Sequence, residues 1–562
     1  MRLINFTPLR DKKYTLSNSF LASQISYHST GYFSKIVTDY ISGNPSITFF
    51  YNHNSDLQGI QNAIVKRKAF KTDRKLLVEQ LQLQYASQSV SKKVKSNLDM
   101  LLQENTFTVC TAHQPNIFTG HLYFIYKIIH AIKLSETLNK ALPENNFVPV
   151  FYMGSEDADI EELGHIFIHG KKYDWNTKQT GAVGRMVVDD ELVEILKNAE
   201  GQLSVEPFGK EVIELMRQFY TKGTTIQNAS FGLINTLFGD SGLIVLLPDN
   251  AALKQTMLPI FEDDIFNNTP FEIVSDTSKK LSEQYKIQAH PREINLFYLK
   301  EDIRSRIEYK NGKYKILNTD IDFNKEELKS ELVNHPERFS PNVILRALYQ
   351  ETILPNVAFI GGGGELAYWL ELKALFQQNQ IPFPVLIIRN SFLFTDKNTE
   401  QLIKKHSLSS EDIFKSDAEI VKQLVKERSK KHLNLESGKK QISAAYGNIK
   451  SHTSAIDSSL NAHTESLLAK ALKKLDQLES KMLKAEKRKF ADEERQVKKI
   501  KNFLFPNGEL QERVENFMPF YAKYGKDLFK IILENSLALE QKFTIISEDH
   551  NTFPIESDTG VI

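Results

Sequence analysis

The stretch FTVCTAHQPNIFTGHLYFIYKIIHAIKL, residues 107–134, passes from a strand pattern through a loop into a helix pattern. Its first six residues form a continuous apolar run, which is typical of a buried strand, and the segment after His121 carries apolar residues at helical spacing. A second apolar run, FVPVFYM (147–153), follows that helix. Two buried strands joined by a helix indicate a parallel sheet covered on both faces, as in doubly wound α/β folds.

A second strand–helix–strand pattern lies at 356–389, NVAFIGGGGELAYWLELKALFQQNQIPFPVLIIR. It predicts a strand, four consecutive glycines, a helix from about Glu365 and a strand at PVLIIR (384–389). SGLIVLLPD (241–249) predicts a further short strand. Right-handed crossovers place the connecting loops at the carboxyl edge of such a sheet, where doubly wound folds bind ligands.

Two intervals fit the parallel sheet poorly, because they contain short alternating segments, and we interpret them as insertions into the core. One of them has a hairpin signal at Asn311-Gly312. From about Glu411 the chain becomes highly charged and poor in aromatic residues, which indicates long helices. The predicted divisions are 1–155 (N-terminal segment and first half of the core), 156–235 (first insertion), 236–264 (core strand region), 265–340 (second insertion), 341–410 (second half of the core), 411–505 (antiparallel coiled coil) and 506–562 (a C-terminal segment packing on the core).

The charged region carries an apolar seam at approximately heptad spacing, which predicts a coiled coil. The partner helix, about 411–454, has fewer large apolar residues, so a hairpin within one chain would leave part of the seam uncovered. A second copy of the chain is the simplest cover, and we therefore predict a homodimer. A solvated helical hairpin packed on its own chain is the alternative. The seam residues are Leu467, Ala471, Leu475, Leu478, Met482 and Ala485.

The composition excludes several classes of protein. The chain has 71 Lys and Arg against 70 Asp and Glu, and a net charge of +1 gives no general attraction to nucleic acid or to anionic membranes. Its one cysteine, Cys110, excludes an intrachain disulfide and lies in an apolar strand pattern. We find no signal peptide and no run long enough to span a membrane, and we expect a cytoplasmic location.

Five carboxylates follow the strand at 147–153 within seven positions. Glu156, Asp157 and Asp159 are close enough to the end of the strand to reach a ligand crevice, where they suit an amine, a sugar hydroxyl or Mg²⁺. The other two, Glu161 and Glu162, are better explained as charges on the first turn of a helix. We take Glu156 and Asp157 as catalytic candidates.

Across the crevice, the loop HQPNIFTGHLYFIYK (113–127) combines hydrogen-bond donors with a glycine at a helix start. Free backbone N–H groups at such a start bind phosphate or carboxylate. His113 is a third catalytic candidate, although lone histidines are usually structural. The predicted binding residues in this loop are Gln114, Gly120, His121, Tyr123 and Lys127.

The glycine run supplies a third wall of the crevice. Four consecutive glycines are conformationally costly, and the benefit is close approach of the backbone to a ligand, with a tight packing turn as the alternative. The run matches neither a Walker loop nor a dinucleotide fingerprint, and the chain has neither the spacing of a zinc site nor a nucleophile elbow. We predict no metal site. The binding candidates here are Gly361, Gly362, Gly363, Gly364, Glu365, Tyr368 and Arg389.

Taken in order, these motifs resemble the BshC family, the cysteine-adding enzymes of bacillithiol biosynthesis. The resemblance covers nearly the whole chain. Within it, Ala158 is a departure, because we expect histidine there in many relatives. The motifs are HQPNIFTGHLYFIYKIIHAIKL, VPVFYMGSEDADIEE, FSPNVILRALYQETILPNVAFIGGGGELAYWLELK, PFPVLIIRNSF and FPNGELQER.

The resemblance implies a Rossmann-like core with two connecting-peptide insertions and a coiled coil that pairs two subunits. It also implies a ligase that adds L-cysteine to glucosaminyl-malate in the last step of bacillithiol biosynthesis. Such a core is similar to the class I aminoacyl-tRNA synthetases, whose His-x-Gly-His signature binds ATP. FTGH (118–121) matches only the last two residues of that signature. ATP with Mg²⁺ is the one cofactor that the reaction suggests.

For this reaction we expect Glu156 and Asp157 to bind the amino sugar. The 113–127 loop and Gly361–Gly364 would then hold the malate carboxylates or a phosphate. Two other functions fit the same residues. A metal-dependent hydrolase of an N-acyl amino sugar is disfavoured because no histidine ligands lie near the acids. A non-catalytic dimeric scaffold is disfavoured because it has no need of the crevice loops.

Overall fold

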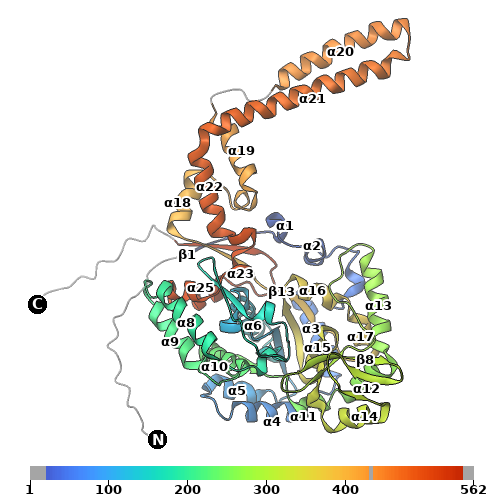
Figure 1. The fold of residues 1–562 in the computed structure, drawn as a ribbon, viewed down its shortest axis with the longest axis vertical. Coiled ribbons are helices and arrows are strands. Elements are labelled where there is room, and N and C mark those ends of the chain that lie inside the picture. The colour runs from blue at the N-terminus through green and yellow to red at the C-terminus, as the bar shows by residue number, and fades with distance from the viewer. Residues whose placement is uncertain (1–19, 430–434, 549–562) are drawn as a thin grey trace, which may run out of the picture. The chain divides into compact units, whose positions relative to one another are not determined.

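A computed structural model describes residues 20–429 and 435–548 of the chain (Figure 1). The chain divides into two compact units. The core unit comprises Gln24–Leu393 and Glu509–Thr544, and the helical unit comprises Phe394–Gly508 with short pieces from both ends of the chain. Within the described ranges, we find no helix of the length and apolar character that a bilayer crossing requires.

A five-stranded sheet, in which every neighbouring pair is parallel, forms the centre of the core unit. Its members coincide with the apolar runs of the sequence, and nearly all their residues are buried, so the predicted doubly wound α/β core is confirmed. Across the sheet the order is β13 (Val385–Ile388), β12 (Asn356–Gly361), β2 (Thr106–His113), β3 (Asn146–Met153) and β6 (Ile244–Leu246).

Crossover helices explain why these strands are parallel. Helix α6 (Tyr123–Ala141) connects β2 to β3, while α16 (Gly363–Leu370) and α17 (Lys373–Gln378) connect β12 to β13. One face of the sheet packs on α6 and on α3 (Leu57–Lys68) through a cluster that includes Phe107. Each apolar side chain buried there contributes about 1.5–3 kcal/mol. Since the strands are parallel, β2, β3, β12 and β13 all end at one edge of the sheet.

The region predicted as the first insertion contains a β4–β5 hairpin and helices, and the second contains a separate antiparallel sheet of order β10-β9-β8-β7-β11. Asn311 and Gly312 have φ of 54° and 78° and connect β8 to β9, which confirms the hairpin prediction. The elements are β4 (His165–Ile168), β5 (Lys171–Asp174), α8 (Asp190–Leu203), α9 (Gly209–Phe219), α10 (Ile226–Phe238), α13 (Thr269–Ser282), β7 (Leu296–Leu299), β8 (Arg304–Lys310), β9 (Lys313–Ile316), β10 (Asp322–Phe323), α14 (Lys325–Asn334) and β11 (Phe339–Pro341).

The helical unit has two parts. In the first, α19 (Asp417–Arg428) packs against α22 (Ala491–Leu504) through buried aliphatic side chains. In the second, α20 (Glu436–Ile456) and α21 (Leu460–Lys487) form an antiparallel hairpin (Figure 1). The single partner helix predicted at 411–454 is wrong, because α19 and α20 are separate helices, and residues 430–434 between them lie outside the described residues.

The boundary of the helical unit also differs from the predicted one. It begins at Phe394 rather than near 411, and α18 (Lys397–Lys405) belongs to it. At the other end, Glu509–Thr544 returns to the core unit, whereas the last part of the predicted C-terminal segment, 549–562, lies outside the described residues.

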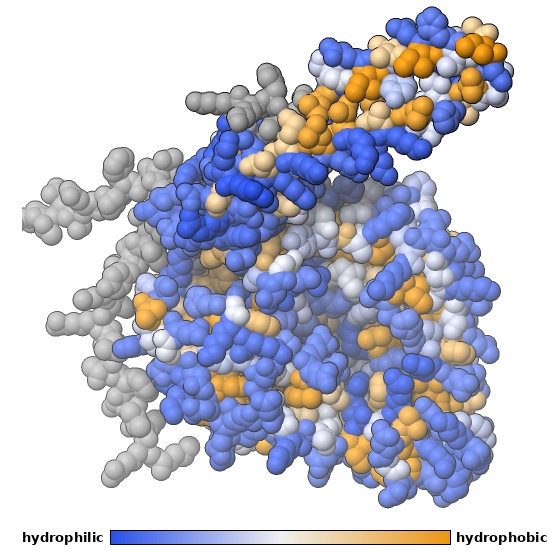
Figure 2. All heavy atoms as spheres, turned by 45° about the horizontal axis from the view of Figure 1, so that its top comes forward, coloured by the Kyte–Doolittle hydropathy of each residue, from blue (hydrophilic) through white to orange (hydrophobic). Residues whose placement is uncertain are grey.

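The α20–α21 hairpin buries little apolar surface. Helix α20 has no buried residue and α21 has one, Thr464. Of the predicted seam, Leu475 and Met482 are half-buried, but Leu467 and Leu478 are 39% and 47% exposed. Figure 2 shows apolar side chains gathered along this hairpin. The predicted seam is therefore split between the inner face of the hairpin and its exposed surface.

Candidate active site

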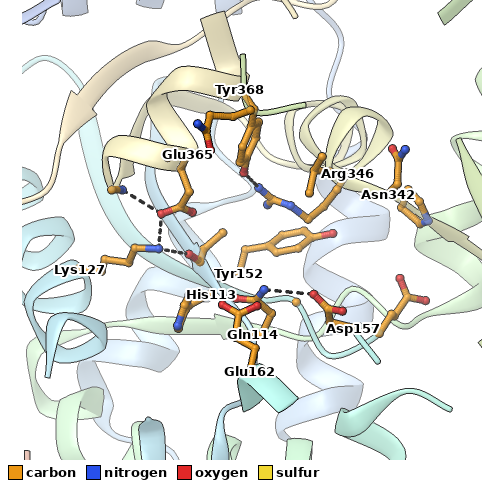
Figure 3. Close-up of a pocket in the computed structure, with 18 of the residues that line it drawn as sticks. His113, Gln114, Lys127, Tyr152, Asp157, Glu162, Asn342, Arg346, Glu365 and Tyr368 are labelled. Carbon is orange, nitrogen blue, oxygen red and sulfur yellow. Dashed lines mark hydrogen bonds and ion pairs between the residues drawn. The ribbon is translucent and has the colours of Figure 1, made fainter. Parts of the chain in front are cut away.

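A cavity of about 490 Å³ opens at the carboxyl edge of the parallel sheet, and all the residues that line it belong to the core unit (Figure 3). The ends of β2, β3 and β13 contribute to it, as do the starts of α6 and α16. Its position agrees with the expectation from the crossovers. The predicted residues that line it are His113, Gln114, Tyr123, Lys127, Glu156, Asp157, Gly362, Gly363, Gly364, Glu365, Tyr368 and Arg389.

Four predicted binding residues do not line the cavity. The ring of His121 bonds through Nδ1 to the carbonyl of Val514 at 3.1 Å, and the carbonyl of Gly120 accepts from Asn516 Nδ2. Asp159 caps the short helix α7 (Ile160–Leu163), since its Oδ1 accepts from the Glu162 N–H, and Gly361 is the last residue of β12. The FTGH match to the synthetase signature therefore does not face the cavity.

The two adjacent acids, Glu156 and Asp157, have different surroundings. Glu156 is 6% exposed and forms a buried ion pair with Lys254, whose Nζ also lies 3.8 Å from Asp249. Arg185 in turn holds Asp249 through two hydrogen bonds of 2.7 and 2.8 Å. Burial raises the pKa of Glu156, and Lys254 opposes that rise. The Glu156 carboxylate is therefore neutralised by a cation of the protein itself and is less available to a ligand than Asp157.

Asp157 is more available to a ligand. Its Oδ2 accepts from Gln114 Nε2 at 3.1 Å, and its Oδ1 accepts from the Ala158 N–H at 2.7 Å. Arg304 Nη1 is 3.8 Å from Oδ1, and a third of the Asp157 side chain is exposed. The Asp159 N–H also donates to Oδ1, at 3.3 Å. Two carboxylate oxygens have about four acceptor positions, so Asp157 retains one on Oδ2 for an amine or a hydroxyl.

Glu162, which the sequence favours only as a charge on a helix, also lines the cavity. Burial raises its pKa, and the neighbouring carboxylates Asp157 and Asp159 raise it further. Its position one helical turn beyond Asp159 follows from α7. A carboxyl group of raised pKa that lines the cavity is suited to proton transfer.

His113 ends β2 and is held by aromatic neighbours, with ring centroids 5.3 Å from Tyr123 and 5.5 Å from Phe124. Burial lowers the pKa of His113 well below its ordinary value, and the Lys127 charge lowers it further. Within the described part of the chain, its buried Nε2 has no hydrogen-bond partner. The imidazole is therefore neutral at pH 7, and its unpartnered Nε2 lies beneath the accessible surface of the cavity wall.

Lys127, Glu365 and Gly362 form a chain of contacts along one wall (Figure 3). The Lys127 Nζ donates to the carbonyl of Ala112 at 2.9 Å and pairs with Glu365. The Glu365 Oε2 accepts from the Gly362 N–H at 2.9 Å, so this amide of the glycine run is occupied by the protein. The next two residues, Gly363 and Gly364, open helix α16, and helix starts leave backbone N–H groups without helical partners.

The glycine run is not required by backbone conformation, since none of Gly361–Gly364 has a positive φ. A Cβ built on Gly364 would meet no heavy atom within 4 Å, although this residue lines the cavity. Glycine within a helix costs about 1 kcal/mol relative to alanine. Because alanine would fit the protein at position 364, the absence of a side chain there favours close approach of a ligand over a packing turn.

The sequence prediction missed several cavity residues, some of them from α15 (Val343–Ile353) and the second insertion. Arg346 donates to the Tyr368 hydroxyl and lies over the Tyr152 ring at 5.5 Å, without a carboxylate within 4.0 Å among the described residues. A detectable signal was the NVILR segment, where a helix-capping Asn342 precedes Arg346 by one turn. The missed residues used below are Tyr152, Glu162, Arg304, Asn342, Arg346 and Arg513.

Comparisons with known proteins agree with this arrangement. The family model described as "Bacillithiol biosynthesis BshC, N-terminal Rossmann-like domain" matches residues 21–390, and the "C-terminal coiled-coil domain" of the same family matches 392–548. Curated proteins named "Putative cysteine ligase BshC" are 37% identical to this chain. Those from Flavobacterium johnsoniae and Flavobacterium psychrophilum align over 93% of it and over 99% and 98% of their own lengths, and that from Cytophaga hutchinsonii over 92% and 97%.

Proposed function

The chain belongs to the BshC family, and on that premise we propose that it is a ligase that joins L-cysteine to glucosaminyl-malate by an amide bond, the last step of bacillithiol biosynthesis. The names of its relatives favour a ligase over the hydrolase and the scaffold. The observation that carries the proposal is Asp157, a partly exposed carboxylate at the strand end that faces the cavity with acceptor capacity to spare.

In this reaction, the neutral amine of the sugar attacks the carboxyl carbon of an activated cysteine. A C–N bond forms, the bond from that carbon to the activating group breaks, and the amine nitrogen loses a proton. Asp157 orients the amine by accepting its hydrogen bonds. The neutral His113 lines the cavity and is the proposed acceptor of this proton once a ligand reaches its buried Nε2, and Glu162 is the second acid–base group of the site.

Negative charge in the ligands requires hydrogen-bond donors, which α15 and the start of α16 provide. Arg346 and the N–H groups of Gly363 and Gly364 suit the malate carboxylates, the developing oxyanion or a phosphate. A carboxylate must be activated before amide formation, and we propose ATP with Mg²⁺ as the reagent. Since FTGH lies outside the cavity, the glycine run and Arg346 are better candidates for its phosphates than Gly120 and His121.

The direct test is to incubate the purified chain with glucosaminyl-malate, cysteine and ATP and to detect the product by mass. We expect one condensation product and a matching amount of AMP or ADP. Omission of any one substrate should abolish product formation. Intact substrates after prolonged incubation, with folded protein, would contradict the proposal.

We also propose that the protein is a homodimer formed through the helical unit. Ile449, Ile456, Leu467 and Leu478 are 38% or more exposed on the α20–α21 hairpin, an unusual amount of apolar surface for two long solvated helices (Figure 2). A second copy of the same hairpin would cover it. We propose neither nucleic acid nor a membrane as a partner, because a net charge of +1 gives no general attraction to either.

A further inference from the structure

One sequence motif, FPNGELQER, is not explained by the reaction described above. The motif spans residues 505–513. The helical unit ends at Gly508, so the second half of the motif belongs to the core unit, as does the segment Gln511–Asn516 that contains its last residues. This segment contains the short helix α23 (Gln511–Val514). Within it Arg513 is exposed and lines the cavity, whereas Glu512 and Asn516 are fully buried.

Glu512, the residue before Arg513, is anchored by buried hydrogen bonds. Its Oε1 accepts from Arg389 Nη2 at 2.7 Å and from the Ser391 hydroxyl at 3.1 Å, and its Oε2 accepts from the Phe392 N–H at 3.3 Å. Burying a carboxylate is costly unless it is paired and hydrogen-bonded, as it is here. These bonds attach α23 to the chain just beyond β13.

Asn516, three residues after Arg513, is also anchored by buried hydrogen bonds. Its Nδ2 donates to the carbonyls of Phe118, at 2.9 Å, and of Gly120. The turn it holds has three consecutive positive φ values, of 48° at Phe118, 70° at Thr119 and 65° at Gly120. Positive φ at a bulky residue such as phenylalanine is strained, and such strain persists only where surrounding contacts impose it. Arg513 therefore lies between two buried residues, one bonded to the chain just beyond β13 and the other to the Phe118–Gly120 turn.

The other cations of the cavity are engaged with the protein. Lys127 pairs with Glu365, Arg389 with Glu512, and Arg304 lies 3.8 Å from Asp157. Arg346 donates to Tyr368. For the Arg513 side chain, no hydrogen bond or ion pair is present among the described residues, and its charge faces a cavity that already holds these cations. An unpaired guanidinium in that place, on a segment whose neighbouring residues are anchored, is suited to an anionic ligand.

We infer that Arg513 binds an anionic oxygen group of a ligand in the cavity, a carboxylate or a phosphate, and that Glu512 and Asn516 are positioning residues for it. The identity of the ligand rests on the proposed function, in which the acceptor carries malate carboxylates and the activating reagent carries phosphates. Arg513 then supplies a second cationic contact in addition to Arg346.

The test measures binding of glucosaminyl-malate and of ATP separately, by calorimetry and without cysteine, to the wild-type chain and to Arg513→Ala. We expect a loss of affinity of about ten- to hundredfold for at least one of the two, as for a charge-assisted hydrogen bond. Loss for glucosaminyl-malate identifies a carboxylate, and loss for ATP identifies a phosphate. Arg513→Lys should lose less, and the melting temperature of each variant should match the wild type.

Arg306→Ala is the matched control, because Arg306 is also exposed but does not line the cavity. The inference would be overturned if Arg513→Ala bound both ligands with wild-type affinity. It would also be overturned if the wild-type chain bound neither ligand. Because no turnover is needed, a chain that binds through Arg513 but forms no product would reject the proposed function and leave the inference standing.

A double-mutant cycle tests the positioning role. Asn516→Ala and Glu512→Gln should lower the affinity for the ligand that Arg513→Ala affects. In the Arg513→Ala background they should lower that affinity little further. A merely structural residue would lower affinity by the same factor in both backgrounds, and that result would overturn the positioning role.

Discussion

The cavity of the core unit and the α20–α21 hairpin differ in what each leaves uncovered. In the core unit, buried charges are paired within the chain, as in Lys254 with Glu156 and Arg389 with Glu512. Two polar groups left without partners there among the described residues, His113 Nε2 and the Arg513 guanidinium, belong to residues that line the cavity. In the hairpin, the groups left uncovered are apolar, and α20 buries no residue at all. We propose that the first region binds small ligands and that the second packs against another copy of the chain.

The largest expected effect concerns the buried pair. Lys254→Met leaves Glu156 as an unpaired buried carboxylate, and breaking such a pair typically destabilises by about 3–5 kcal/mol. Urea denaturation of the variant should show this loss as a lower transition midpoint. Lys222→Met, which removes a cation that pairs with Asp190 on the surface, is the control and should change little. If both variants unfold like the wild type, Glu156 is not committed to Lys254 and regains its place as a catalytic candidate.

The second effect concerns the hairpin. Leu467→Asp with Leu478→Asp should split the proposed dimer, because each leucine buried at an interface contributes about 1.5–3 kcal/mol. Light scattering should give the mass of two chains for the wild type and of one chain for the double variant. Leu102→Asp, at a residue that is 50% exposed in the core unit, should leave the mass unchanged. A wild-type mass of one chain at micromolar concentration would contradict the dimer.

The parallel sheet was predictable because its strands are continuous apolar runs and its crossovers are local in sequence. The acids after β3 and the glycines after β12 were placed at the cavity for the same reason. Arg304, Arg346 and Arg513 were missed since their approach to the cavity depends on the packing of an insertion, a helix and a late segment. Likewise, the turn at Phe118–Gly120 is imposed by Asn516, which no local pattern reveals.

The third effect depends on pH. Burial lowers the pKa of His121 and of His130 to about 4, although each has a backbone hydrogen bond that opposes the shift. In the unfolded chain these groups titrate near 6.5, so the unfolded state takes up protons first as the pH falls. The contribution of these two histidines to the stability of the core unit is therefore full above about pH 6.5 and declines from there toward pH 4, by up to about 1.4 kcal/mol per pH unit for each histidine.

Urea midpoints measured between pH 7 and pH 5 check this dependence. His130→Gln, which retains a donor and an acceptor, should show a shallower decline than the wild type. If the urea midpoint changed with pH equally in the two proteins, His130 would not be a source of the pH dependence. The hairpin offers no such buried histidine among its described residues, so its unfolding should respond less to pH.

The smallest effect concerns the glycine run. Gly364→Ala should stabilise the core unit by about 0.5–1 kcal/mol, because the position is helical and the added methyl meets nothing. It should nevertheless weaken ligand binding. Gly201→Ala, in α8, is the matched control, since its added methyl also meets nothing and it does not line the cavity. If Gly364→Ala keeps wild-type affinity for glucosaminyl-malate and ATP, the glycine does not make room for a ligand.

The central claim is that the amide bond is formed in this cavity with Asp157 orienting the amine. Single-turnover product formation by Asp157→Asn, at saturating substrates and with an unchanged melting temperature, tests it most directly. Loss of one hydrogen bond to a charged group is worth about 1.5–3 kcal/mol, so we predict a rate at least about tenfold lower. A folded Asp157→Asn protein that forms product at the wild-type rate would contradict the claim.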